Sequence, residues 1–169
     1  MDPSVVFMRA VNVGGHGTFR PSLLARELAD LGVTSIGAAG TFVVRSAILR
    51  TALRDRIQAK LPFKAQMMIC PVRELLDLAA PDPIPKGAKA FLSVMEKTPR
   101  TVPPLPLCRP TKDAWEVRIL QVSGRYVLSL CRRLGKNILY PNEVVEKEFA
   151  MAATTRNWNT ISAISAILK

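Results

Sequence analysis

The sequence has few of the residues that build metal centres and disulfide frameworks. Its three cysteines, Cys70, Cys108 and Cys131, are odd in number and none has C-x-x-C spacing, and its single histidine is His16. This excludes a recognisable zinc site and a disulfide framework, and unpaired cysteines are typical of a reducing compartment. We expect no metal and no cofactor.

Long apolar runs are also absent. After Met1-Asp2-Pro3 the chain is apolar for only a few residues, without the basic start of a signal peptide. No segment reaches the roughly 20 apolar residues that cross a bilayer. We therefore expect a cytoplasmic protein with no membrane partner. Its 169 residues, 49% of them hydrophobic, suffice for one domain or two small, closely packed ones.

Acidic residues are scarce. Lys and Arg number 24 against 13 Asp and Glu, which gives a net charge of +11. Residues 1–85 carry 10 basic and 7 acidic groups, whereas residues 86–169 carry 14 and 6. Such an excess favours an anionic partner, although it also serves solubility. Because the basic residues are spread singly rather than in a block, a small anionic ligand is favoured over nucleic acid.

The first half alternates strand and helix patterns. An apolar run at residues 5–11 predicts a strand buried on both faces. Pro21 begins a helix that ends at Gly32, with Leu24, Leu28 and Leu31 facing inward. Two strands at residues 35–38 and 41–45 follow. The next helix is capped by Ser46 and reaches Lys60, and its Leu49, Leu53 and Ile57 face inward. A strand at residues 64–70 ends this half. The order β-α-β-β-α-β is the split βαβ pattern of a ferredoxin-like unit, here residues 1–80.

Residues 81–169 predict a second, smaller α+β subdomain. A short helix at residues 71–79 precedes it. Eight of the thirteen prolines fall between residues 81 and 110, and we interpret residues 99–110 as a proline-rich loop. The other predicted elements are a strand at 89–96, a hairpin of 115–122 and 125–131, and helices at 142–151 and 156–168. The fold class predicted is α+β.

Arg9 is the only charged residue in the first predicted strand. A buried guanidinium requires a partner, because an unpaired buried charge costs several kcal/mol. Two interpretations remain open: an internal salt bridge, for instance to Glu27 or Glu146, or a position beside the following loop where Arg9 binds an anionic or carbonyl group.

The loop Asn12–Gly17 has three glycines in four residues, including Gly14 and Gly15. It matches neither a Walker loop nor a dinucleotide fingerprint. Its N–H groups are suited either to an anion nest or to a plain strand-to-helix turn. His16 has no visible partner.

The segment Thr154–Thr160 is richer in polar groups than a helix start requires. If Thr154 or Thr155 caps the last helix, its first N–H groups and Arg156 together favour a negative charge. Asn157 and Asn159 are two residues apart, so they point in different directions.

These two segments resemble the domain of unknown function 1697 family. Residues 7–15, FMRAVNVGG, are similar to its LRGINVGG opening, and Thr154–Thr160 matches its TTRNWNT signature. Tyr140-Pro141-Asn142 and the following Glu146 resemble the segment before that signature. The resemblance implies an α+β fold with two ferredoxin-like subdomains, and it implies no activity. The family's Q-S-G-N hairpin is Ala38-Ala39-Gly40-Thr41 here, so either a site is altered or the hairpin is mainly a turn that requires Gly40.

We expect a small anionic or phosphate-bearing ligand to bind in a cleft between the Arg9–Gly15 loop and the helix start at Thr155. No nucleophile–base pair is visible, so the sequence assigns no reaction and leaves open whether the protein is an enzyme. The alternatives are an RNA- or DNA-binding module, or a structural protein in which these residues form an internal network. The candidate ligand-binding residues are Arg9, Asn12, Gly14, Gly15, Gly40, Asn142, Glu146, Thr155, Arg156, Asn157 and Asn159.

Overall fold

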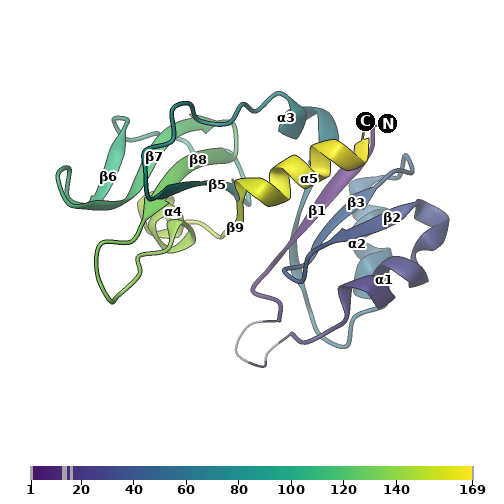
Figure 1. Ribbon diagram of the computed structural model, residues 1–169. Coiled ribbons are helices and arrows are strands. Elements are labelled where there is room, and N and C mark those ends of the chain that lie inside the picture. The colour runs from purple at the N-terminus through teal and green to yellow at the C-terminus, as the bar shows by residue number, and fades with distance from the viewer. Residues whose placement is uncertain (1, 13–14, 16, 169) are drawn as a thin grey trace. The chain divides into compact units, whose positions relative to one another are not determined.

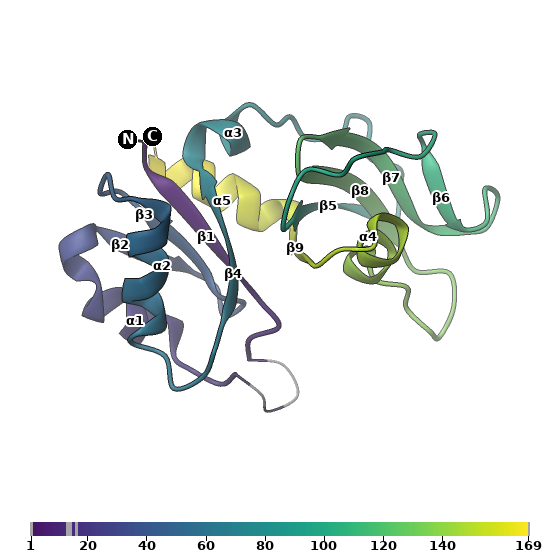
Figure 2. The same cartoon turned by 180° about the vertical axis from the view of Figure 1, so that it is seen from behind.

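The computed structural model of the chain describes residues 2–12, 15 and 17–168. It has the predicted mixed α+β fold, built on two antiparallel sheets (Figures 1 and 2). The chain divides into two units, Met1–Leu78 with Ala163–Lys169, and Ala79–Ser162. We had placed the whole C-terminal helix in the second subdomain, but the end of α5 (Trp158–Leu168) belongs to the first unit. There Arg45 Nη2 donates a 3.0 Å hydrogen bond to Ile167 O.

The sheet of the first unit has the strand order β2-β3-β1-β4. The β-α-β-β-α-β order predicted for this half is confirmed, with a short helix added at its end. The central strand β1 is buried along almost its whole length, which explains its apolar composition. The elements are β1 (Ser4–Arg9), α1 (Pro21–Glu27), β2 (Val33–Ile36), β3 (Thr41–Val44), α2 (Arg50–Gln58), β4 (Gln66–Pro71) and α3 (Val72–Leu76).

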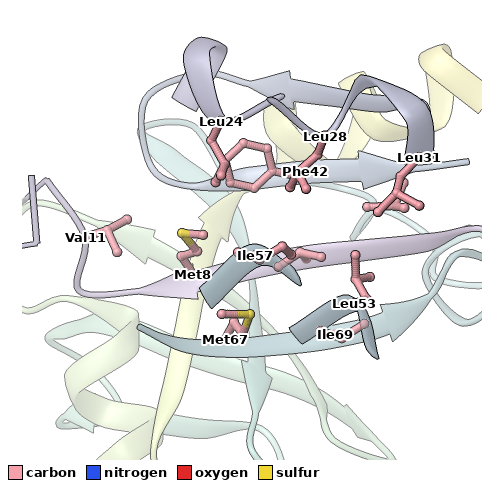
Figure 3. Close-up of a cluster of buried hydrophobic side chains, with 12 residues drawn as sticks. Met8, Val11, Leu24, Leu28, Leu31, Phe42, Leu53, Ile57, Met67 and Ile69 are labelled. Atoms are coloured by element: carbon pink, nitrogen blue, oxygen red, sulfur yellow. The ribbon is translucent and has the colours of Figure 1, made fainter. Parts of the chain in front are cut away.

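Helices α1 and α2 cover one face of this sheet. Figure 3 shows Leu24, Leu28 and Leu31 pointing toward Phe42 and the strands, while Leu53 and Ile57 come from α2. The inward leucine stripe was predicted from its helical spacing. After α1 a 3₁₀ turn, Ala29–Leu31, carries the chain to Gly32, which takes a left-handed conformation at φ 62°.

The start of α2 differs from the prediction. The helix begins at Arg50, and its N-cap residue is Leu49. The N-cap therefore lies three residues after Ser46, the cap that the sequence predicts. Leu49 therefore lies outside the inner stripe and is 63% exposed, whereas Leu53 and Ile57 are 0% and 2% exposed. No side chain caps this helix start.

The second unit has a five-stranded sheet in the order β6-β7-β8-β5-β9. The predicted hairpin of β7 and β8 is confirmed. Helix α4 packs Val144, Val145 and Phe149 on one face of this sheet. Because four strands precede the helix, a second ferredoxin-like subdomain is not confirmed. The elements are β5 (Ala88–Met95), β6 (Leu107–Pro110), β7 (Trp115–Ser123), β8 (Tyr126–Arg132), α4 (Pro141–Phe149) and β9 (Ala153–Asn157).

The proline-rich segment is not entirely a loop, because it includes β6. This strand pairs only with β7 and forms an edge of the sheet, where proline is tolerated. The register shifts between Arg109 and Pro110, where the strand ends.

We expect Leu53→Ala to destabilise the first unit by about 2–5 kcal/mol, because it opens a cavity in the core. Leu49→Ala, the same change on an exposed residue, should alter the free energy of unfolding by less than about 0.5 kcal/mol. Urea denaturation followed by circular dichroism measures both. Equal losses would contradict the start of α2 described above.

Candidate functional site

Arg9 ends β1 and lies half-buried at the edge of the loop that follows. It stands opposite Gln66 of β4, and its Nη1 donates to Gln66 Oε1 over 3.3 Å. The guanidinium is thus held by a neutral cross-strand partner, at the end of the strand that leads into the glycine loop.

Asn12 organises the loop after β1. Its Nδ2 donates to Ala38 O at 3.0 Å, and its Oδ1 accepts from Phe19 N at 2.9 Å. Its backbone N–H donates to Gly17 O at 3.2 Å. Asn12 also adopts φ 55°, in the left-handed region that asparagine tolerates better than most residues. The Asn12 side chain therefore ties both ends of the loop to the β2–β3 turn.

Gly15 has φ 77° and no heavy atom within 4 Å of the place where a Cβ would lie. Its backbone is exposed at the loop surface. Gly14 and His16, which the sequence analysis singled out, lie outside the described residues.

Gly40 is required by a close approach of two backbones. It has φ 73°, and a Cβ there would lie 2.8 Å from both Met8 Cβ and Val11 Cγ2. Its carbonyl accepts a 2.8 Å hydrogen bond from Met8 N. These contacts favour the interpretation of residues 38–41 as a turn for which Gly40 is indispensable.

The segment Thr154–Asn157 is a strand and not the start of a helix, so the predicted helix start at Thr155 is wrong. β9 pairs with β5 in a register that places Thr155 opposite Ser93. Two threonines favour a strand, and the ladder with β5 pairs the backbone groups on one side of β9. Helix α5 begins only at Trp158.

Asn157 caps this helix. Its Oδ1 accepts from Thr160 N at 3.0 Å and from Thr160 Oγ1 at 3.2 Å. An acceptor bound to the third helical N–H is the usual N-cap interaction. Asn159 lies in the first turn and is exposed.

Thr155 joins three elements through its hydroxyl. It donates to Asn142 Oδ1 of α4 at 2.9 Å and lies 2.6 Å from Ser93 Oγ of β5. Because a hydroxyl has one proton and the amide oxygen can only accept, Ser93 must donate to Thr155. Ser93 is 0% exposed, so this chain of hydrogen bonds runs inside the second unit.

Glu146 makes the second link between α4 and β9. Its Oε1 accepts a 2.9 Å hydrogen bond from Ala153 N. Asn142 and Glu146 are four residues apart and so share one face of the helix. Both therefore hold the helix against the strand.

Arg156 is only 9% exposed, and its Nη1 donates to Thr154 Oγ1 and Thr155 O, each at 2.9 Å. Burial lowers the pKa of its guanidinium to about 10, so the group is still a cation at neutral pH. The structure thus brings Asn142, Glu146 and Thr155 together in the second unit, whereas Arg156 points to the opposite face of the same strand. Arg9, Asn12, Gly15 and Gly40 lie in the first.

Ser93 is the residue in this network that the sequence analysis missed. It is a serine inside the otherwise apolar part of β5, at residues 90–95. Such a residue requires a buried partner, and that requirement was the only signal available. In the described part of the chain, no three His, Cys, Asp or Glu side chains gather into a metal-binding group. None of the described helices is long and apolar enough to span a membrane.

Gly40→Ala should destabilise the first unit by about 2–4 kcal/mol, because it combines a left-handed backbone with a steric clash. Gly37→Ala is the matched control: Gly37 has φ 62° but open space around its Cβ position. We expect the control to lose about 1–2 kcal/mol of stability, which is the cost of a left-handed backbone for alanine. The two losses, measured by urea denaturation with circular dichroism, should differ; identical values would rule out the clash.

Thr155→Val keeps the side-chain shape but leaves Ser93 and Asn142 without their shared partner. We expect the second unit to lose about 1–3 kcal/mol. Thr101→Val, at an exposed threonine of the same unit, should change stability by less than about 0.5 kcal/mol. Trp115 and Trp158 both lie in this unit, so urea denaturation followed by tryptophan fluorescence reports on it. A Thr155→Val variant as stable as the wild type would remove the structural role of the hydroxyl.

Comparison with known proteins gives three results. The structure is similar to that of the conserved bacterial protein SP0830 from Streptococcus pneumoniae, with a TM-score of 0.64 and 14% identity. The match covers 99% of this chain and 98% of that one, and at this identity it supports the fold alone. A comparison with curated proteins gives no match. The family model described as "Protein of unknown function (DUF1697)" matches residues 1–119, which excludes the segment Thr154–Thr160. This match extends over more than half of the chain, which therefore belongs to the DUF1697 family.

Proposed function

We propose that the protein binds a small anionic, phosphate-bearing ligand at the end of β1, through Arg9 and the loop backbone at Gly15. The observation that carries this is the placement of Arg9, half-buried where the central strand enters the glycine loop and hydrogen-bonded to neutral Gln66. A half-buried guanidinium held at a fixed place suits the recognition of phosphate oxygens.

The loop is built to keep such a site in place. The Asn12 amide closes it and ties it to the β2–β3 turn, while Gly15 exposes its backbone at φ 77°. In this proposal Asn12 and Gly40 position the loop, and Arg9 contacts the ligand. The first unit serves as a ferredoxin-like platform, supported by its element order and by the sheet order β2-β3-β1-β4.

In this proposal the polar residues of the second unit stabilise its fold and do not contact the ligand. Asn142, Glu146, Thr155 and Arg156 each hydrogen-bond within α4, β5 or β9. This supports the internal-network interpretation for them, with Asn157 as the cap of α5.

Recognition of RNA by stacking on sheet aromatics is disfavoured, because Phe7 of β1 is 0% exposed. The three free cysteines support a cytoplasmic location.

A thermal-shift screen of nucleotides and phosphorylated metabolites tests the site. A ligand present at about 100 times its Kd should stabilise the wild-type first unit by about 2.7 kcal/mol. Arg9→Gln should abolish this response, because it removes the charge that binds phosphate. Arg9→Lys should retain part of it.

Arg26→Gln, at an exposed arginine of α1, is the matched control and should respond like the wild type. Equal responses of the Arg9→Gln and Arg26→Gln variants would show that Arg9 does not bind the ligand. No response of the wild type to any phosphate-bearing compound would contradict the proposed function itself.

A further inference from the structure

The loops that follow β6 and β8 leave the sheet of the second unit at the same end. β6 ends at Pro110, opposite Trp115 at the start of β7, and β8 ends at Arg132 beside the same strand start. Because the paired strands are antiparallel, side chains that are far apart in the sequence meet here. Five basic residues lie at or near this end, on β7, on β8 and in the two loops: Lys112, Arg118, Arg132, Arg133 and Lys136. Asp113 and Glu116 are the acidic residues of the same stretch, 107–136.

The charges of these five residues are not neutralised by acidic side chains. Two of the arginines donate to backbone carbonyls: Arg132 to Trp115 O (2.7 Å) and Asp113 O (3.2 Å), and Arg133 to Gly135 O (2.9 Å) and Lys136 O (3.2 Å). A carbonyl group is neutral, so it fixes a guanidinium in place without cancelling its charge. None of the five basic residues forms an ion pair with any residue that the structure describes. This end of the second unit therefore attracts anions.

Arg118 is held flat against a buried indole. Its Cζ lies 4.2 Å from the centre of the Trp115 ring, and Cζ of Arg132 lies 4.1 Å from the same centre. Trp115 is only 4% exposed and packs with Ala90 and Leu130 in an apolar cluster. Stacking on this fixed ring orders the guanidinium of Arg118, which is half-buried. Arg118 therefore offers a flat cationic surface, whereas the indole beneath it is covered.

Two buried polar atoms beside this stack lack hydrogen-bond partners. Arg118 Nε and Glu116 Oε1 are both buried, and neither is hydrogen-bonded within the part of the chain that the structure describes. The two residues are only two apart on β7, yet they form no ion pair with each other. A buried polar atom without a partner costs free energy and calls for a group that is not part of the protein chain. The group required here accepts a hydrogen bond from Arg118 and donates one to Glu116.

The chemistry of these two atoms distinguishes between classes of anion. Fully ionised phosphates and carboxylates only accept hydrogen bonds, so they suit Arg118 and are repelled by the carboxylate of Glu116. A nucleobase carries N–H donors as well as acceptors on its edge, and its flat face stacks on a guanidinium plane. The phosphates attached to it suit the basic residues of the two loops.

We propose that this end of the second unit binds single-stranded nucleic acid. One base stacks on the guanidinium of Arg118 and hydrogen-bonds to Glu116, and neighbouring phosphates contact Lys112 and Lys136. A single strand is required, because the edges of its bases are free of pairing partners. This surface shares no residue with the proposed site at Arg9, and each proposal stands without the other.

Fluorescence anisotropy with the full chain tests the contact with the base. The probes are a fluorescein-labelled RNA of roughly 12 nucleotides and an abasic strand of the same length, which has the phosphates without the bases. We expect the base-bearing strand to bind roughly tenfold tighter, because stacking contributes only there. Arg118→Lys keeps the charge but loses the planar group, so it should remove this preference and leave the abasic strand nearly unaffected. Circular dichroism verifies that each variant is folded.

The dependence of binding on salt tests the phosphate contacts. The double variant Lys112→Gln/Lys136→Gln should lower the slope of log K against log salt by about 1.4, because each phosphate contact on a single strand contributes about 0.7. Lys60→Gln/Lys64→Gln is the matched control, since it removes two exposed lysines from the first unit. It should leave the slope unchanged, and equal slopes for the two double variants would contradict the placement of the phosphates.

Glu116→Gln separates recognition of a base from general attraction to positive charge. Removing a carboxylate should strengthen binding of the abasic strand, whereas the base-bearing strand should bind more weakly because its acceptor is changed. Equal affinities of the wild type for the two strands would overturn the proposal. So would sedimentation with phosphatidylserine vesicles in place of RNA binding, which would assign this surface to a membrane. Arg9→Gln should leave RNA binding unchanged, which keeps this outcome separate from that of the first site.

Discussion

The pairing of β9 with β5 determines which face of the sheet each polar side chain of β9 occupies. In this register Thr155 lies opposite Ser93, and alternate residues of β9 point to opposite faces of the sheet. Thr155 therefore meets Asn142 of α4, while Thr154 and Arg156 share the other face and hydrogen-bond to each other. A shift by one residue would exchange these faces and leave buried polar groups without partners. The polar side chains and the register therefore require each other.

A steric constraint plays the same part in the first unit. The β2–β3 turn approaches β1 so closely that Gly40 has no room for a Cβ between Met8 and Val11. That approach brings the turn within reach of Asn12, whose amide then holds the loop after β1. The conformation of the loop thus depends on a glycine about 25 residues further along the chain, and the contact forms here with two alanines, Ala38 and Ala39, before that glycine.

The sequence predicted those elements in which the spacing of apolar residues indicates which side chains are buried. Leu24, Leu28 and Leu31 have helical spacing and form the inner stripe, and the apolar run at residues 5–11 marked a central strand. Two kinds of information were missing. Ser46 is a good cap residue, but nothing local shows that the helix begins only at Arg50, after an extended Leu49. Thr154 and Thr155 suit both a helix cap and a strand, and only the long-range pairing with β5 decides between them.

Arg9 and Arg156 both stand out in the sequence, but they differ in how deeply the fold buries them. Arg156 is enclosed, and the loss of hydration lowers the pKa of its guanidinium, so its nearest hydroxyl and carbonyl acceptors serve to keep the charge in place. Arg9 is half-buried at the end of β1, with the amide oxygen of Gln66 as a cross-strand partner. A ligand can approach a guanidinium of the second kind without first displacing buried structure. The same residue type therefore stabilises a strand in one unit, and in the proposed function it contacts the ligand in the other.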